Sequence, residues 1–220
     1  MKSSDVLEYT HSVPQDASEA PLNRRDRRRL EIYERIVEAG EALFEEQGYD
    51  ETKVAEICER ADVAYGTFFN HFPTKLDLLR EMADRALVRM VERLEELSKQ
   101  RGNIEDLLIL LFEGGAQTFQ ELSPGRRELV GRVQTLAYTD SPEDRDRRFH
   151  AAFQAFLRRA VEEGRVRDDV PVETLAEVVS SSFAFMSLSW LHFDDYPVRE
   201  RAASAARFLA STLAPKGERK

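Results

Sequence analysis

Apolar residues recur at the spacing of an α-helix along almost all of this 220-residue sequence, and this constrains the fold more than any other feature. From Leu30 onward they fall three or four residues apart, and no segment shows the alternation of a half-buried strand. Proline, glycine and capping residues divide the sequence into helices over about 30–48, 52–62, 64–72, 74–100, 104–122, 124–138, 142–163, 172–193 and 198–213. The sequence therefore predicts an all-α fold of about nine helices, the short ones grouped near the N-terminus.

The composition is that of a soluble globular protein, with 42% hydrophobic and 33% charged residues. The single cysteine, Cys58, excludes an internal disulfide framework and a cysteine-rich zinc site. The first residues are polar, unlike a secretory signal, and no apolar run approaches the roughly 20 residues of a membrane span. We therefore expect a cytoplasmic protein with no membrane partner, no metal and no cofactor.

The net charge of −9 is unevenly distributed along the chain. Residues 24–29 hold five arginines and one aspartate, whereas residues 30–80 hold twelve acidic and five basic residues. A short basic block just before a helix suggests an arm that meets phosphates, with a solvated basic run or the start of the helix itself as the simpler alternatives. The preceding residues 1–23 are polar and without period, which predicts a disordered tail.

Residues 52–72, TKVAEICERADVAYGTFFNHF, predict two short helices joined by a tight turn. Ile57, Ala61, Val63 and Phe68 have the spacing to hold these helices against each other at a steep angle. Such a helix-turn-helix unit places its second helix in the major groove of DNA, where the N-terminal residues of that helix reach base edges. The pattern therefore indicates DNA recognition.

Residues 30–80 resemble the DNA-binding domain of the TetR family of transcriptional regulators. The resemblance begins with a first helix that has an acidic face and ends in Phe44-x-x-x-Gly48-Tyr49. It continues through Thr52-x-x-x-x-Ile57 and Ala61-x-Val63-x-x-Gly66-Thr67-Phe68-Phe69-x-His71-Phe72-x-x-Lys75-x-x-Leu78-Leu79. The remaining helices agree with the family only in number and length.

The resemblance implies a DNA-binding domain over residues 24–80 and a larger helical domain over residues 81–215 that binds an effector and dimerises. It implies base contacts from the first turn of the recognition helix, at Tyr65, Gly66 and Thr67. The other residues assigned to DNA are expected to meet phosphates: Arg24, Arg25, Arg27, Arg28, Lys53, Phe69, Asn70, His71 and Lys75. The arginine block is expected to supply much of the electrostatic affinity.

Three positions depart from the family pattern. Phe69 stands where tyrosine is usual, so a phenolic hydroxyl is absent, and Phe69 either packs on the DNA or belongs to the core. Asp62 stands where glycine is usual in the turn, and aspartate tolerates the left-handed region at some cost. Ala64 replaces the usual serine or threonine, so the recognition helix loses a capping acceptor.

Residues 178–193 contain no formally charged residue over more than four helical turns. Because a surface helix needs a polar face, this segment is expected to be buried on two sides, by its own core and by a second copy. Family members dimerise through their last long helices, which points to helices 142–163 and 172–193, with a central helix of a monomeric bundle as the alternative. The residues assigned to the dimer are Phe149, Phe153, Phe156, Val179, Phe183, Met186 and Trp190.

The effector cavity is expected among the helices between residues 83 and 138 and the helix of 172–193, with Gly114-Gly115 as a weak local hint. The residues assigned to its wall, each of which taken alone is more typical of ordinary core, are Leu108, Phe112, Gln117, Phe119, Tyr138, Phe183, Met186 and Trp190. Since most of them are apolar, the expected effector is a hydrophobic or aromatic small molecule. The helix from Thr74 joins both domains and is expected to transmit ligand binding in the larger domain to the DNA-binding domain.

Two other classes of protein fit the sequence less well. An all-helical enzyme is disfavoured because H-E-x-x-H, G-x-S-x-G and phosphate-loop motifs are absent, and no catalytic residue is assigned. A helical adaptor dimer without sequence-specific DNA binding would not need the segment Tyr65–Lys75 and the arginine block together. We therefore interpret the chain as a TetR-like regulator, in this family commonly a repressor, that binds a palindromic operator as a homodimer and is released by a ligand.

Overall fold

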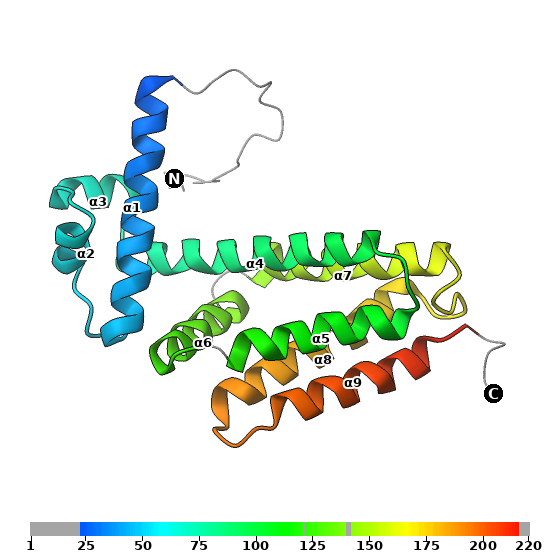
Figure 1. The fold of residues 1–220 in the computed structure, drawn as a ribbon. Coiled ribbons are helices and arrows are strands. Elements are labelled where there is room, and N and C mark those ends of the chain that lie inside the picture. The colour runs from blue at the N-terminus through cyan, green and yellow to red at the C-terminus, as the bar shows by residue number, and fades with distance from the viewer. Residues whose placement is uncertain (1–22, 121, 140–141, 216–220) are drawn as a thin grey trace, which may run out of the picture.

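The computed structural model describes residues 23–120, 122–139 and 142–215, with side chains except at 119, 137–139 and 142–147. Within these ranges the chain forms nine helices and no strand (Figure 1). The helices are α1 (Arg24–Gln47), α2 (Val54–Arg60), α3 (Tyr65–His71), α4 (Lys75–Lys99), α5 (Ile104–Gln120), α6 (Pro124–Thr139), α7 (Pro142–Glu162), α8 (Val172–His192) and α9 (Val198–Leu213). The all-α prediction is confirmed, whereas the predicted tail lies outside the described residues except for Asn23.

Helices α1 to α3 form a small domain with a core of its own. Its buried side chains include Ile36, Phe44, Ile57, Phe68 and Leu78, the last of which comes from the first turns of α4. Thr52 ties α1 to α2, since its buried hydroxyl donates to the Gly48 carbonyl oxygen at 2.7 Å. The spacing that predicted the helix-turn-helix unit thus corresponds to a real packing interface.

The first helix begins six residues earlier than predicted. The Asn23 side-chain oxygen accepts from the backbone N–H groups of Arg25 and Asp26 at 2.9 and 3.0 Å, which caps the helix. Residues 24–29 are therefore the first turns of α1, and the predicted arm ahead of the helix is wrong in form. Figure 1 shows this end of α1 projecting well beyond α2 and α3.

The turn between α2 and α3 has the conformation expected from its unusual aspartate. Asp62 is the one non-glycine residue with positive φ (49°) in the described part of the chain. Ala64 gives α3 no side-chain cap. The recognition helix is therefore held by packing rather than by a favourable N-terminus.

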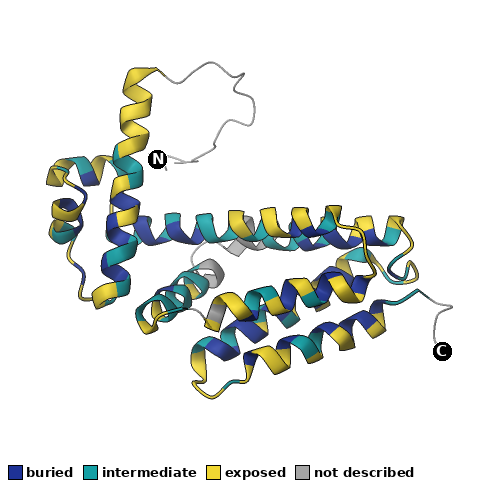
Figure 2. Ribbon diagram, viewed as in Figure 1, coloured by how far each residue is buried: buried dark blue, intermediate teal, exposed yellow. Residues whose placement is uncertain are grey.

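Helices α4 to α9 form the larger domain. The most extensive packing is between α5 and α9, between α4 and α7, and between α7 and α8. Figure 2 shows buried residues on the inner sides of these helices and exposed residues on the outer sides. Helix α4 runs from the small domain into this bundle, after a capping box in which Thr74 and Asp77 exchange hydrogen bonds at 2.9 and 3.2 Å.

Helix α8 corrects one sequence expectation. By length and composition Val172–His192 would also suit a membrane span, contrary to the expectation that no apolar run approaches that length. Half of this apolar window is buried inside the helical domain, as in the core helix of a soluble protein. Core packing therefore accounts for its composition.

Candidate functional site

The outer face of α3 exposes two large aromatic side chains beside small and polar ones. Tyr65 is 57% exposed and Phe69 is 39% exposed, and their ring centroids lie 5.0 Å apart. Gly66 and Asn70 are also exposed, and Thr67 is half-buried. Because aromatic rings exposed at this level are costly in water, the face is typical of a contact surface, and Phe69 belongs to it rather than to the core.

The inner face of α3 anchors it. Phe68 is fully buried, and Phe72 just after the helix is nearly so. The Phe72 ring stacks on Tyr33 of α1 with centroids 5.0 Å apart. These contacts fix the orientation in which Tyr65 and Phe69 point outward.

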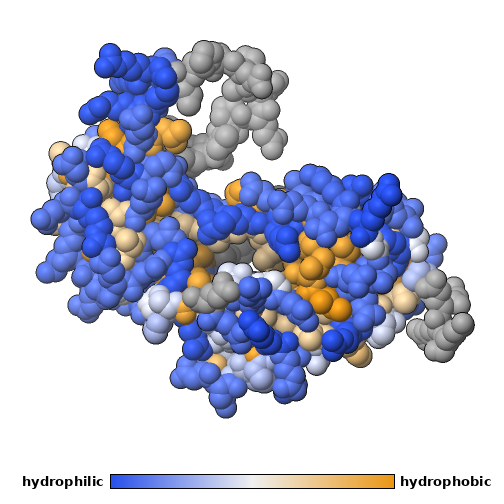
Figure 3. Space-filling model, in the orientation of Figure 1, coloured by the Kyte–Doolittle hydropathy of each residue, from blue (hydrophilic) through white to orange (hydrophobic). Residues whose placement is uncertain are grey.

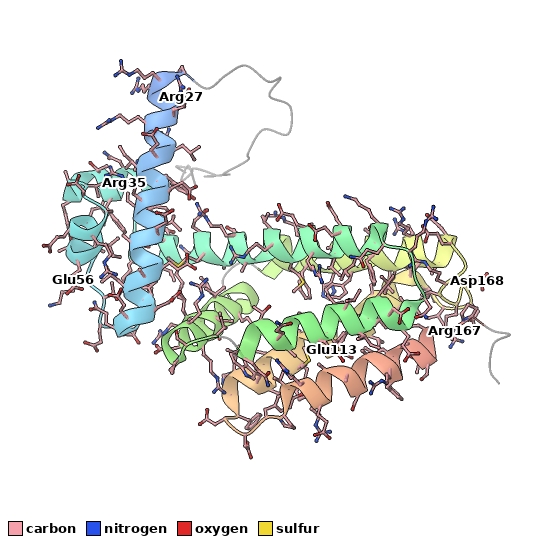
Figure 4. The ribbon with its side chains drawn as sticks, in the orientation of Figure 1. Arg27, Arg35, Glu56, Glu113, Arg167 and Asp168 are labelled. Carbon is pink, nitrogen blue, oxygen red and sulfur yellow. The ribbon has the colours of Figure 1, made fainter. Side chains whose placement is uncertain are left out.

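The arginine end of α1 is a second exposed surface of the small domain. Arg24, Arg25, Arg27 and Arg28 are all exposed, and their side chains have no hydrogen bond or ion pair among the described residues. Figure 3 shows hydrophilic residues covering this projecting end, and Arg27 points away from the rest of the domain in Figure 4. Positive side chains at a helix N-terminus oppose the helix dipole, so local stability does not explain them.

His71 lies between these two surfaces. It is half-buried, its ring centroid is 6.1 Å from that of Tyr33, and it is near Arg29. Burial lowers the pKa of His71, and the positive charge of Arg29 lowers it further. The lowered pKa favours the neutral imidazole at pH 7.

The structure gives Lys75 another role than the assigned phosphate contact. Its Nζ donates to the carbonyl oxygens of Tyr49 and Thr52 at 2.7 and 2.9 Å and lies 4.3 Å from the centre of the Tyr49 ring. Lys75 thus fixes the segment that joins α1 to α2. Lys53 remains exposed, and its backbone N–H donates to Glu56 Oε2 at 2.9 Å.

The larger domain holds an apolar pocket of about 320 Å³. Its wall comes mainly from α4 and α6, through Met82, Leu87, Met90, Leu129, Val130 and Val133. Phe183 of α8 closes one side. The polar wall groups include Gln134, whose buried Oε1 has no hydrogen-bond partner among the described residues. The pocket therefore suits a mainly apolar molecule that carries a polar group.

The small domain matches a known family of DNA-binding domains. The model of the bacterial regulatory proteins of the tetR family matches residues 36–82, from the middle of α1 into α4. The transcriptional repressor KstR of Rhodococcus jostii (strain RHA1) is 26% identical over 193 residues, which cover 86% of this chain and 83% of KstR. Residues 36–82 form a TetR-family DNA-binding domain.

Two further proteins are similar to this chain. The fatty acid metabolism regulator of Bacillus subtilis (strain 168) is 30% identical over 80 residues, which span 36% of this chain and 41% of that relative. FadR of Thermus thermophilus, a TetR-family repressor solved in complex with lauroyl-CoA, is 23% identical with a TM-score of 0.64. The superposition covers 86% of this chain and 98% of FadR, and it shows a shared fold.

The pocket differs from the set of residues assigned from sequence. Phe183 lines it, and Trp190 lines a separate groove, whereas Leu108, Phe112 and Met186 are buried in the core and Gln117 is exposed. The side chains of Phe119 and Tyr138 lie outside the described residues. The apolar wall residues of α4 and α6 are missing from the assigned set, although Leu129, Val130 and Val133 share a helical face that would have indicated them.

The residues assigned to the dimer are mostly used inside the chain's own core. Phe153, Phe156, Val179, Phe183, Met186 and Trp190 are at most 8% exposed, and Phe149 is partly buried against them. They therefore have little surface to offer a second copy. The large apolar side chains exposed on the last two helices are instead Val178, Phe185 and Phe208.

The glycine pair in α5 allows close packing and does not interrupt the helix. Helix α5 continues from Ile104 to Gln120 through Gly114 and Gly115. A Cβ atom at Gly115 would lie 3.0 Å from the Phe183 ring. Glycine therefore lets α8 approach α5 beside the pocket.

Proposed function

We propose that this protein is a repressor that binds a two-fold symmetric operator as a homodimer and is released by an apolar effector. The observation that carries the proposal is the exposed face of α3 next to the unpaired arginines of α1. A helix in the major groove reads base edges from its first turns, whereas neighbouring cations bind phosphates. Tyr65, Gly66 and Thr67 occupy those first turns.

A homodimer is proposed because one half-site is too short for tight specific binding. The face offered is on α8 and α9, which pack on each other. Val178 and Phe185 lie seven residues apart on one stripe of α8 and are 51% and 69% exposed, and Phe208 of α9 is 68% exposed. Such exposed apolar residues are typical of an interface with another subunit.

The dimer predicts the behaviour of Phe185→Glu. A charge in the centre of an apolar interface remains desolvated and unpaired, so the variant is expected to sediment as a single 25.3 kDa chain where the wild type sediments at about twice that mass. Val88→Glu, at another exposed apolar residue on α4, is the matched control and should remain dimeric. A dimeric Phe185→Glu variant would place the interface elsewhere.

The effector class follows from the pocket wall. Apolar side chains of α4, α6 and α8 surround a cavity large enough for a small hydrophobic molecule. The complex of Thermus thermophilus FadR with lauroyl-CoA supports a ligand with an apolar chain as the first candidate. A ligand that binds better to the conformer with mis-spaced recognition helices lowers DNA affinity by the same coupling energy.

A gel-shift titration on DNA upstream of the protein's own gene tests operator recognition. Wild-type protein is expected to select one fragment over random DNA, and Thr67→Ala to weaken that complex roughly 5- to 150-fold, as for a lost base contact of about 1–3 kcal/mol. Glu59→Ala, exposed on α2, is the control and should bind as the wild type. Equal binding to all DNA would instead support the adaptor alternative.

A further inference from the structure

We propose that the apolar pocket takes an anionic amphiphile whose acidic head group competes with Glu41 and Glu45 for Arg126. This inference rests on the proposed function, because it assumes that the pocket is the effector site. Beyond the proposed function, it assigns a negative charge to the effector and names the contact that transmits its binding to the DNA-binding domain. That contact is made by α6, in addition to α4, the helix predicted to transmit it.

Helix α6 lies between two hollows. One side of it lines the apolar pocket through Val130 and Val133, and the other lines an open groove of about 1030 Å³ through Gly131 and Thr135. A helix with space on both sides can shift without displacing a close-packed core. A molecule that enters the pocket therefore contacts a helix that has open space on its other side.

The N-terminal end of α6 is joined directly to α1. The Arg126 guanidinium pairs with the carboxylates of both Glu41 and Glu45. A Cβ atom at Gly125 would collide with the backbone carbonyl of Glu45, so the two helices touch main chain to main chain there. Further along α6, Arg132 pairs with Asp50 at the end of α1 and lies over the Tyr49 ring. A shift of α6 therefore moves α1.

The charges of the pocket wall favour an anion. Arg126 and Arg89 both line the pocket, against one acidic residue, Glu41. Arg89 is exposed, and it has no ion pair among the described residues. An ammonium group would find only Glu41, which Arg126 already holds. A carboxylate or phosphate would find two guanidinium groups, the preferred partners of such groups.

Competition for Arg126 supplies the coupling. When α6 is joined to α1, two glutamates surround one arginine, and an additional anion is repelled by them. When α6 has moved away, Arg126 can turn to the head group without that repulsion. The anion thus binds better to the separated conformer and shifts the population toward it. Since α1 carries the arginine end, the separated conformer has a displaced DNA-binding surface.

Calorimetry on the full-length protein without DNA tests the head-group charge. Dodecanoate is expected to bind at least tenfold tighter than methyl dodecanoate or dodecylammonium, the lower limit for a charge-assisted hydrogen bond. Arg126→Met should reduce this preference severalfold and leave the part that Arg89 supplies, and Arg126→Lys should keep more of it than Arg126→Met. Binding of the ester by both variants shows that the pocket is intact. Equal binding of the three probes to wild-type protein, or tighter binding of the ammonium, overturns the inference.

The double variant Glu41→Gln/Glu45→Gln tests the ion pairs that join α6 to α1. It keeps Arg126 but removes its competitors, so dodecanoate should bind severalfold tighter than to wild-type protein. Dodecanoate should weaken wild-type DNA binding by about 5- to 150-fold, and the double variant should respond less than fivefold. Glu38→Gln, exposed on the same helix, is the matched control and should respond as the wild type. An unchanged affinity for dodecanoate in the double variant contradicts the competition.

The two experiments also separate this inference from the proposed function. If wild-type protein selects no DNA fragment, the repressor proposal fails, while the calorimetric preference for an anion and its reduction in Arg126→Met still decide the head-group assignment. If DNA is bound specifically but dodecanoate shows no preference over its ester, the repressor proposal stands and the Arg126 assignment fails.

Discussion

Replacing Arg24, Arg25, Arg27 and Arg28 with glutamine is expected to lower operator affinity about 4000-fold at 0.1 M salt. Each phosphate contact contributes about 0.9 to the slope of log affinity against log salt. If two of the four arginines contact phosphate in each half-site, a dimer loses four contacts. The slope then falls by about 3.6, and at 0.1 M salt the affinity falls by a similar number of decades.

The same substitutions should leave the protein at least as stable as the wild type. The four arginines lie in the first turns of α1, where the helix dipole disfavours positive charge by roughly 0.3–1 kcal/mol for each residue in the terminal turn. Removing them should raise the free energy of unfolding by about 1 kcal/mol. Weaker DNA binding together with equal or greater stability identifies a binding role, because a structural role would change both in the same direction.

A control with the same change in total charge separates a local effect from a general one. Lys99, Arg101, Arg158 and Arg159 are exposed on the larger domain, and replacing all four with glutamine removes the same number of positive charges. This variant should keep the wild-type salt slope. Titrations of both variants from 0.05 to about 0.3 M salt measure the slopes, and an unchanged slope in the α1 variant would show that its arginines do not contact DNA.

Replacing Phe68 with alanine is expected to cost about 3–5 kcal/mol of stability and to abolish operator binding. Phe68 is fully buried in the core of the small domain. Phe→Ala changes in protein cores cost this much because apolar burial is lost and a cavity is left behind. Helix α3 has only seven residues and no side-chain cap. Without Phe68, little remains to hold the recognition helix in place.

The loss should be confined to the small domain. The core around Phe68 and Ile57 is a separate cluster from the core around Phe112 and Phe153. Differential scanning calorimetry of Phe68→Ala should therefore show an early transition for the DNA-binding domain and a nearly unchanged one for the larger domain. A single transition displaced as a whole would show that the two cores unfold together.

The neighbouring aromatic residue provides the control. Phe69 lies on the outer face of α3 and is 39% exposed, so Phe69→Ala should change stability by less than about 1 kcal/mol. It should nevertheless weaken operator binding, because the exposed ring is expected to pack on the DNA backbone. If Phe69→Ala bound DNA normally, the ring would serve only to cover Phe68, with which it is in edge contact at 5.3 Å between centroids.

The sequence by itself determined those features that depend on neighbours along the chain. Helical periodicity indicated the all-α class and most of the helix boundaries, and the helix predicted from Thr74 does begin there, with a Thr74–Asp77 capping box. The spacing of Ile57, Ala61 and Phe68 gave the packing of α2 on α3, and the positive φ of Asp62 followed from its position in the turn. These are local preferences of backbone and side chain, which a pattern can record.

The tertiary structure alone decided where charges and apolar side chains meet. Lys75 bonds to carbonyl oxygens more than twenty residues away, so no local pattern showed that its charge holds a loop. An apolar pattern does not distinguish a residue at a subunit interface from a residue in the core. Phe153 and Phe183 are buried because α7 packs on α8 within the same chain. The pairing of Arg126 with Glu41 and Glu45 arises because α6 crosses α1, and such crossings are set by the sum of packing over the whole bundle rather than by any one segment.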